Sequence, residues 1–176
     1  MKNKTPVLWF TGLSGAGKST LSQAMYKKLT DSNIRSTIID GDILRQGLCK
    51  NLGFTKEDRS ENIRRAGEVA KLFADADILT LAAFMSPMDA DRNLVRKLIG
   101  TDRFIEIYCK CSFDVCESRD VKGLYKKVRA GQLKNFVGLD EPYEEPSDPE
   151  LKIDTDRLSI EESTDLIMKY LESKYF

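Results

Sequence analysis

The chain has 176 residues, of which 41% are hydrophobic, and its 28 lysines and arginines balance 28 aspartates and glutamates. This length supports one sizeable core, so we expect a single domain over residues 1–176. A formal net charge of zero removes the overall field that drives unspecific binding to nucleic acids or membrane surfaces. The apolar run near the N-terminus is too short for a signal peptide or a membrane span. We therefore expect a cytoplasmic protein with no nucleic acid and no membrane as partner.

The cysteine pattern points away from disulfides and zinc. The four cysteines form no Cys-x-x-Cys pair, and the chain contains no histidine. In a reducing compartment such residues are free thiols. They are Cys49, Cys109, Cys111 and Cys116.

Apolar runs of strand length alternate with amphipathic stretches along the chain. This alternation is typical of an α/β fold in which helices flank a parallel sheet. Apolar residues at helical spacing predict one helix between the first two strands and another over residues 61–76. A closing helix over 159–176 begins at a capping box formed by Ser159 and Glu162. The predicted strands cover residues 7–10, 36–40, 78–84, 104–109 and 151–155.

The first predicted strand leads directly into a glycine-rich loop, "GLSGAGKS", at residues 12–19. The loop matches G-x-x-x-x-G-K-S and opens a predicted helix, which is the context that a phosphate-binding P-loop requires. Its glycines let backbone N–H groups point inward, and the helix N-terminus adds partial positive charge. We expect Lys18 to neutralise the β- and γ-phosphates of ATP and the Ser19 hydroxyl to bind Mg²⁺. The predicted ATP-binding residues of the loop are Gly12, Leu13, Ser14, Gly15, Ala16, Gly17, Lys18, Ser19 and Thr20.

The second predicted strand ends in the acidic stretch "IIDGDILR". Since no Asn-Lys-x-Asp motif for reading guanine follows, a kinase is favoured over a GTPase-type switch. Ligands of doubly wound sheets bind beyond the carboxyl ends of the strands, which places Asp40 and Asp42 near the γ-phosphate. Phosphoryl transfer to a hydroxyl needs a carboxylate that accepts the proton, and Asp42 is the predicted base. Asp40 is expected to hold the metal's water shell or a loop N–H, or to close an Asx-type turn with Gly41.

Arginines are concentrated after this stretch, which on a neutral chain suggests a local anion site. If Ser60 or a neighbour caps a helix that starts near Glu61, Arg59 and Asn62 lie at its N-terminus, where an anionic acceptor could bind. The last two arginines are equally well explained as a solvated helix surface. The four are Arg45, Arg59, Arg64 and Arg65.

Residues 119–149 have a different composition from the rest of the chain. Glycines and prolines interrupt this segment, charged residues are frequent, and no long apolar period runs through it. The segment is predicted to be a mobile lid over a site, although an ordinary surface excursion would have a similar composition.

Several stretches, in this order along nearly the whole chain, resemble the adenylylsulfate kinase family. They are "GLSGAGKST", "DGDILRQGL", "LGFTKEDRSENIRR", "FMSP", "SRDVKGLYKKVRAG" and "NFVGLDEPYEEP". The P-loop is generic, whereas "LGF…DR.ENIRR" and "RD.KGLY" are specific to this family. The resemblance implies a P-loop NTPase fold, transfer of the γ-phosphate of ATP to the ribose 3′-hydroxyl of adenylyl sulfate, and a homodimer.

The resemblance also implies how the nucleotide acceptor is bound. Arg45, Arg59 and Asn62 correspond to residues that hold its phosphate and anhydride end. Phe54 and Phe136 correspond to aromatic residues that sandwich its base, a contact that suits any flat ring. The predicted acceptor-binding residues are Asp40, Asp42, Arg45, Phe54, Arg59, Asn62, Met85, Ser86, Lys122 and Phe136.

Three further residues take roles from the same resemblance. Ser86 matches a serine associated with a phosphoserine intermediate, but with no histidine to activate it we expect a substrate contact instead. Arg119 resembles the residue that packs on the adenine of ATP, and Lys122 resembles one that contacts the acceptor. The predicted catalytic residues are Asp42, Lys18 and Ser86.

The chain departs from the family pattern at three positions close to the predicted acceptor site. Gln46 stands where the family usually has histidine, and Met88 and Asp89 stand where it has an aromatic residue and an arginine. Because a reversed charge beside a bound anion is costly, an alternative hypothesis keeps the 3′-hydroxyl kinase chemistry on another nucleotide, such as cytidine diphosphoramidate used in capsule decoration. A third hypothesis, an ATP-binding regulatory subunit without catalysis, conflicts with the presence of Lys18 and Asp42.

Overall fold

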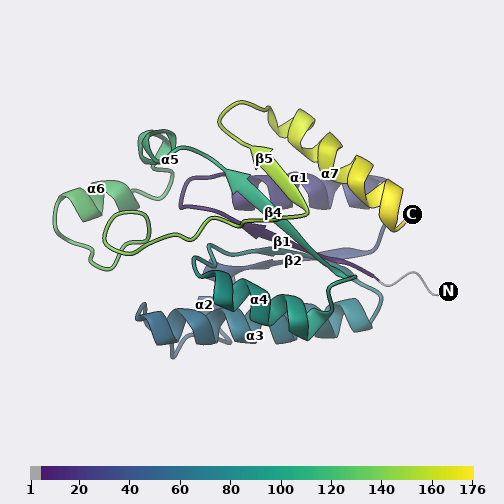
Figure 1. Ribbon diagram of the computed structural model, residues 1–176, viewed down its shortest axis with the longest axis horizontal. Helices are drawn as coiled ribbons and strands as arrows, with labels where there is room; N and C mark the ends of the chain where they lie inside the picture. Colours follow the sequence, from purple (N-terminus) through teal and green to yellow (C-terminus); the bar gives the residue numbers. More distant parts are fainter. Residues whose placement is uncertain (1–4) are drawn as a thin grey trace.

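The computed structural model describes residues 5–176 and is built on a five-stranded sheet with the strand order β2-β3-β1-β4-β5 (Figure 1). All neighbouring strands pair in parallel, so their carboxyl ends lie at one edge of the sheet. The five predicted strands are confirmed, each end within one residue. Their bounds are β1 Val7–Thr11, β2 Ser36–Asp40, β3 Leu79–Ala83, β4 Phe104–Lys110 and β5 Leu151–Asp154.

Helices cover both faces of the sheet, with α1 and α7 on one side and α3 and α4 on the other (Figure 1). The central strand β1 serves both layers because successive side chains of a strand point to opposite faces. Leu8 and Phe10 pack with α1 and α7, whereas Val7 and Trp9 pack with α3 and α4. The helices are α1 Lys18–Asp31, α2 Gly41–Gln46, α3 Lys56–Asp75, α4 Asp89–Ile99, α5 Phe113–Arg119, α6 Leu124–Arg129 and α7 Ile160–Lys174.

The predicted closing helix and its capping box are confirmed. The Ser159 hydroxyl accepts a hydrogen bond from the Glu162 N–H (3.1 Å), and the Glu162 carboxylate accepts one from the Ser159 N–H (2.8 Å). Each side chain thereby satisfies a backbone donor that the first helical turn leaves unpaired.

The start of α3 corrects the predicted cap. The helix begins at Lys56, where Thr55 is the N-cap and its hydroxyl accepts a hydrogen bond from the Asp58 N–H (3.2 Å). Ser60 lies inside the helix, and its hydroxyl instead donates to Asp91 (3.0 Å). Arg59 is therefore in the first turn of α3, one turn further into the helix than the sequence suggested.

Helix α4 is absent from the predicted elements, because its core-facing side carries a charge. Arg92, Val95 and Ile99 are its buried residues, so an arginine occupies the place of an apolar residue and interrupts the periodic pattern. The helix still packs closely on α3, since a Cβ at Gly67 would lie 2.9 Å from a Val95 methyl group.

The segment predicted to be a lid contains α6 and packs partly onto the core. Tyr125 and Phe136 are buried, and Tyr125 stacks edge-to-face on both Phe113 and Phe136. The remainder, from Gly131 to Glu150, contains neither helix nor strand. The mobility of residues 119–149 stays a prediction.

The four cysteines are free and buried, as predicted. Burial raises the pKa of the Cys109 thiol to about 12, so this group stays protonated at neutral pH. Among residues 5–176, no three side chains of the His, Cys, Asp or Glu type form a group that could hold a metal ion. In the same described range, no helix has both the length and the apolar character needed to cross a membrane.

The capping box gives a stability prediction. Replacing Ser159 by alanine should lower the free energy of unfolding by about 1 kcal/mol, because an N–H of the first turn loses its acceptor. Chemical denaturation followed by circular dichroism measures the change. Ser173→Ala, in the last turn of the same helix, is the matched control and should alter the value by less than about 0.5 kcal/mol. Equal losses in the two variants would contradict the capping role.

Candidate functional site

The P-loop can adopt its conformation only with glycine at two positions. Gly12 and Gly15 have φ angles of 148° and 81°. A Cβ at Gly12 would lie 2.6 Å from the carbonyl oxygen of Cys109, and one at Gly15 would lie 2.8 Å from that of Cys116. Gly17, the N-cap of α1, has no side chain to cover the first turn. The N–H groups at this helix end are therefore available to a phosphate.

Lys18 is the charged centre of this loop. Its ammonium donates hydrogen bonds to the carbonyls of Gly12 (2.9 Å) and Leu13 (2.7 Å). The residue as a whole is half-buried, but its ammonium lies enclosed, and burial lowers its pKa from 10.5 to about 8. Bound phosphates would favour the charged form of this group.

Arg119 lies against the same loop, at the end of α5. Its guanidinium donates to the carbonyl of Gly15 (3.2 Å) and to that of Thr155 (2.7 Å), which follows β5. The Thr155 hydroxyl in turn donates to the carbonyl of Ala16 (2.9 Å). The structure thus places the predicted adenine-packing residue beside the P-loop, together with Thr155, which the sequence analysis did not single out. A threonine after a short strand gives little sequence signal.

A carboxylate meets the P-loop at the end of β2. The Ser19 hydroxyl donates to one oxygen of Asp40 (2.9 Å), and the other oxygen accepts a hydrogen bond from the N–H of Asp42 (2.9 Å), which caps α2. Asp40 therefore closes the expected Asx-type turn and also faces the residue predicted to bind metal. A hydroxyl and a carboxylate are the hard oxygen ligands that Mg²⁺ prefers.

Asp42, the predicted base, lies in the first turn of α2 and forms an ion pair with Lys122. Both side chains are exposed. The segment 119–149 thus brings its lysine to the same carboxylate that the sequence analysis selected for proton transfer.

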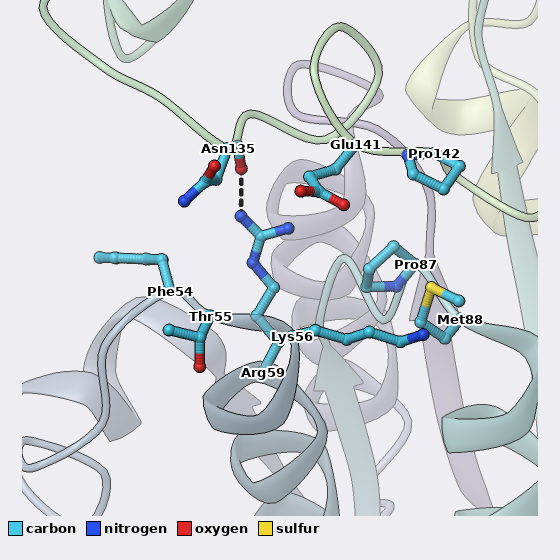
Figure 2. Close-up of a pocket in the computed structure, with 9 residues that line it drawn as sticks. All are labelled: Phe54, Thr55, Lys56, Arg59, Pro87, Met88, Asn135, Glu141 and Pro142. Carbon is cyan, nitrogen blue, oxygen red and sulfur yellow. Dashed lines mark hydrogen bonds between the residues drawn. The ribbon is translucent and has the colours of Figure 1, made fainter.

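A pocket of about 260 Å³ opens between the start of α3, the loop before α4 and the segment after α6 (Figure 2). Phe54, whose side chain is 61% exposed, lies on one side, and Pro87 and Met88 lie on the other. The Arg59 side chain rises between them and donates a hydrogen bond to the carbonyl of Asn135. The lining residues are Phe54, Thr55, Lys56, Arg59, Pro87, Met88, Asn135, Glu141 and Pro142.

The sequence analysis found two of these lining residues, Phe54 and Arg59. Arg45 reaches the same region, because its guanidinium lies over the Phe54 ring at 4.5 Å and donates to the carbonyl of Gly53 (2.9 Å). Lys56 was missed, although its side chain extends across the pocket towards Met88 (Figure 2). A lysine in the first turn of a helix and prolines in loops give no periodic signal that would have identified them.

Three other predicted acceptor-binding residues lie deeper in the protein. Phe136 is 6% exposed and packs in the core beside Tyr125, so only its neighbour Asn135 lines the pocket. Asn62 is 5% exposed, and among the described residues nothing partners its Oδ1 atom. Since a buried acceptor without a donor is costly, a ligand or water is expected to supply one. The carbonyl of Met85 accepts a hydrogen bond from Thr11 (2.7 Å).

Ser86 is also buried, with its hydroxyl inside the fold. The hydroxyl accepts a hydrogen bond from the Trp9 indole N–H (3.1 Å) and donates one to Thr11 (3.0 Å). Its contact with substrate stays a prediction, and in this arrangement its neighbours Pro87 and Met88, and not Ser86 itself, line the pocket.

The arginine cluster separates into two groups. Arg64 and Arg65 both pair with Glu61 on the surface of α3, and these hydrogen bonds lower the pKa of Glu61 to about 2. The interpretation as a solvated helix surface fits Arg64, whereas Arg65 is half-buried and also donates hydrogen bonds to the carbonyl of Leu48 (2.9 Å) and the side chain of Asn51 (2.8 Å). Arg45 and Arg59 are the arginines that lie at the pocket.

A glycine loop that exposes helix N–H groups, a buried lysine and two aspartates at one sheet edge define a P-loop kinase. Comparisons with known proteins then identify the family. Residues 4–154 match the model of the family described as adenylylsulphate kinase. The adenylyl-sulfate kinase of Oceanobacillus iheyensis is 58% identical over 99% of this chain and 87% of its own length. That of Staphylococcus carnosus is 55% identical over 98% of this chain and 86% of its own.

A solved structure agrees with these relatives. The APS kinase of Mycobacterium tuberculosis, in complex with AMPPNP and APS, matches with a TM-score of 0.91 and 42% identity, over 96% of this chain and 98% of that one. The chain belongs to the adenylylsulphate kinase family, and the predicted P-loop kinase fold is confirmed.

The enclosed ammonium of Lys18 predicts a pH-dependent affinity for ATP. In the free protein Lys18 loses its proton above a pKa of about 8, whereas bound phosphates favour the charged form. Affinity should therefore fall as the pH rises from 8 to 10, approaching about tenfold per unit, and binding should take up a proton. Isothermal titration calorimetry in buffers with different ionisation heats measures both effects.

Two variants test the assignment of this titration. Lys18→Arg carries a guanidinium that does not titrate in this range, so its weaker binding should be flat with pH. Lys28→Arg, on the same helix, should keep the wild-type slope. A wild-type affinity that stays constant from pH 7.5 to 9.5 would exclude Lys18 as the titrating group.

Proposed function

We propose that the protein transfers the γ-phosphate of ATP to the ribose 3′-hydroxyl of adenylyl sulfate, giving 3′-phosphoadenylyl sulfate. The observation that carries this proposal is the 58% identity to an adenylyl-sulfate kinase over 99% of the chain. The geometry supports it, because a phosphate-binding loop, a carboxylate and a pocket with two cationic side chains lie at one edge of the sheet.

ATP is bound by the P-loop in this proposal. The N–H groups of the loop and of the first turn of α1 hold the β- and γ-phosphates, and Lys18 exchanges its carbonyl partners for phosphate oxygens. Arg119 spans Gly15 and Thr155 beside the P-loop, which supports the proposal that its planar guanidinium stacks on adenine.

Mg²⁺ would be held by Ser19, with Asp40 bound to the metal or to its water shell. The 2.9 Å contact between these two side chains supports this pair, since both are oxygen ligands facing the P-loop. The ion supplies charge neutralisation across the phosphates when bound. Asp40 also fixes the first turn of α2, so the residue that approaches the metal also orients Asp42.

The acceptor is positioned by the pocket beside Asp42. Its base stacks on the exposed ring of Phe54, while Arg45 and Arg59 face its phosphate and anhydride. Asp42 accepts the proton of the 3′-hydroxyl as that oxygen attacks phosphorus in line with the leaving ADP. Because Asp42 is paired with Lys122, the ribose hydroxyl must displace or share this lysine when it enters.

The unusual acidic residue at position 89 fits adenylyl sulfate as the acceptor. The Asp89 carboxylate accepts hydrogen bonds from Arg92 (3.2 Å) and Asn93 (2.6 Å). Both donors belong to α4, so these contacts hold the carboxylate against its own helix. Asp89 is not one of the residues that line the pocket, where two cations, Lys56 and Arg59, outnumber one carboxylate, that of Glu141. The local charge therefore favours an anionic acceptor over the less charged terminus of cytidine diphosphoramidate.

Cellular location and assembly follow as lesser proposals. Four free and buried cysteines suit a reducing compartment, and we place the protein in the cytoplasm on that ground. The homodimer implied by the family resemblance stays a prediction.

The central test is turnover with different acceptors. Coupled ADP release from MgATP should be fast with adenylyl sulfate and slow with cytidine diphosphoramidate, and the product should carry phosphate on the 3′-oxygen.

Asp42→Asn should lower kcat by about 10² to 10⁴, because the general base is lost. Asp165→Asn removes another exposed carboxylate that is paired with a lysine, Lys28, and should leave turnover unchanged. Fast turnover with the other nucleotide alone would replace the acceptor, and ATP binding without any transfer would indicate a regulatory subunit.

The metal assignment has its own test. Ser19→Ala should raise the Mg²⁺ concentration needed for half-maximal turnover by about tenfold, since one oxygen ligand is lost. Thr30→Ala removes another exposed hydroxyl of α1, one that donates to the carbonyl of Tyr26 (2.8 Å), and should keep the wild-type requirement. If both variants respond to Mg²⁺ alike, Ser19 is not the ligand.

A further inference from the structure

Arg92 is a charged side chain that the proposed mechanism does not use, although it is only 1% exposed. Its guanidinium donates hydrogen bonds to the carbonyls of Ser86 (2.8 Å) and Glu144 (2.7 Å). It also pairs with Asp89 (3.2 Å) and with the buried Glu106, whose carboxylate oxygen lies 2.7 Å from Nε. One buried group thus contacts a loop, a distant segment, its own helix and β4.

The two carbonyls belong to two adjoining walls of the acceptor pocket, both of them across the pocket from Phe54 (Figure 2). Ser86 precedes Pro87 and Met88 on one wall, and Glu144 follows Glu141 and Pro142 on the other. The walls also touch directly, because the N–H of Glu144 donates to Pro87 (2.9 Å) and its side chain accepts from the N–H of Asp89 (2.7 Å). Arg92 lies beneath this junction and fixes both sides at once.

The backbone at Ser86 needs such support. Its φ angle of 40° lies in the left-handed region, which costs free energy for a residue with a side chain and persists only where surrounding contacts impose it. The Ser86 hydroxyl is held by Trp9 and Thr11, and its carbonyl is held by Arg92. Without Arg92, the carbonyl would be free to turn and the wall at Pro87 would move with it.

The chemistry of the guanidinium explains why an arginine is needed here. A planar fork with five N–H donors serves two carbonyls and a carboxylate together, which neither a lysine nor an apolar side chain can do. Stability alone does not explain a buried charge, since a buried ion pair is often no more stabilising than well-packed apolar residues. Burial raises the pKa of Glu106, while Arg92 and Arg96 oppose that shift.

We propose that Arg92 is a positioning residue for acceptor binding, which holds the two adjoining pocket walls in place through the carbonyls of Ser86 and Glu144. It touches neither ATP nor the reacting atoms. This role rests on the proposed function, because it concerns the site that adenylyl sulfate occupies.

Steady-state kinetics of the full-length protein tests the proposal. Arg92→Lys keeps a cation beside Glu106 but loses the fork, and Arg92→Met with Glu106→Leu removes both buried charges without leaving one unpaired. Both variants should raise KM for adenylyl sulfate by about tenfold or more, because small displacements of positioning groups are costly. KM for ATP and the dissociation constant of AMPPNP should stay within about twofold of wild type.

Arg96 provides the matched control. It lies one turn further along α4 and pairs with Glu106 (3.0 Å) and Glu150, but it has no contact with either pocket wall among the described residues. Arg96→Met should lower the unfolding temperature and leave KM for adenylyl sulfate unchanged. An equal rise of this KM in Arg96→Met, or a parallel rise of both KM values in the Arg92 variants, would reduce Arg92 to a structural role and overturn the proposal.

Failure of the proposed function has a different signature. If wild type shows no turnover with adenylyl sulfate, the acceptor is wrong, and the same variants are compared with the nucleotide that does react. If the double variant does not fold, Arg92→Lys decides the outcome. An unchanged acceptor KM in a folded Arg92 variant overturns the positioning role in every case.

Discussion

Both oxygens of the Asp40 carboxylate accept hydrogen bonds, and the arrangement of the rest of the site depends on these two contacts. One oxygen accepts the hydrogen bond of Ser19 in the P-loop, and the other caps α2 through the N–H of Asp42. The phosphate-binding half and the acceptor half of the site are therefore joined through one side chain at the end of β2. This position fits a parallel sheet, in which ligands bind beyond the carboxyl ends of the strands.

The chain has no net charge, so recognition of its anionic ligands depends on where single charges are placed. Lys18 is enclosed by backbone, Arg119 spans two loops, and Arg92 is buried under the pocket. Arg64 and Arg65 on α3 share Glu61 as a partner, and Arg64 also pairs with Glu68. The positions of these individual charges thus provide the attraction for anions that a basic surface provides in proteins that bind polyanions.

Much of the fold could be predicted from the sequence, because its signals are local or periodic. Five apolar runs gave the strands, a single motif gave the phosphate site, and Ser159 with Glu162 gave the start of α7. Helix α4 could not be predicted, since Arg92 occupies a buried position where the pattern requires an apolar residue. The cap of α3 was misplaced because Thr55 and Ser60 are both suitable capping residues.

The candidate site was predictable only where one short motif carried the chemistry. The P-loop and Asp42 are of this kind. Lys56 begins α3, whereas Asn135 and Pro142 belong to the segment after α6, and only the folded chain brings them together at the pocket. Burial is equally invisible in the sequence: Phe136 and Ser86 have side chains inside the protein, although the family motif places them at the acceptor.

In the free protein, the carboxylate of Asp42 is already paired with the ammonium of Lys122. Any acceptor that needs the carboxylate must compete with an ammonium carried by the segment 119–149, so acceptor affinity and the position of that segment are thermodynamically linked. The link is reciprocal: whatever draws Lys122 away frees the base, and a bound acceptor releases the lysine. Since both groups are exposed, dissolved salt screens their attraction. Raising the ionic strength should therefore weaken the ion pair and make it easier for Lys122 to separate from Asp42.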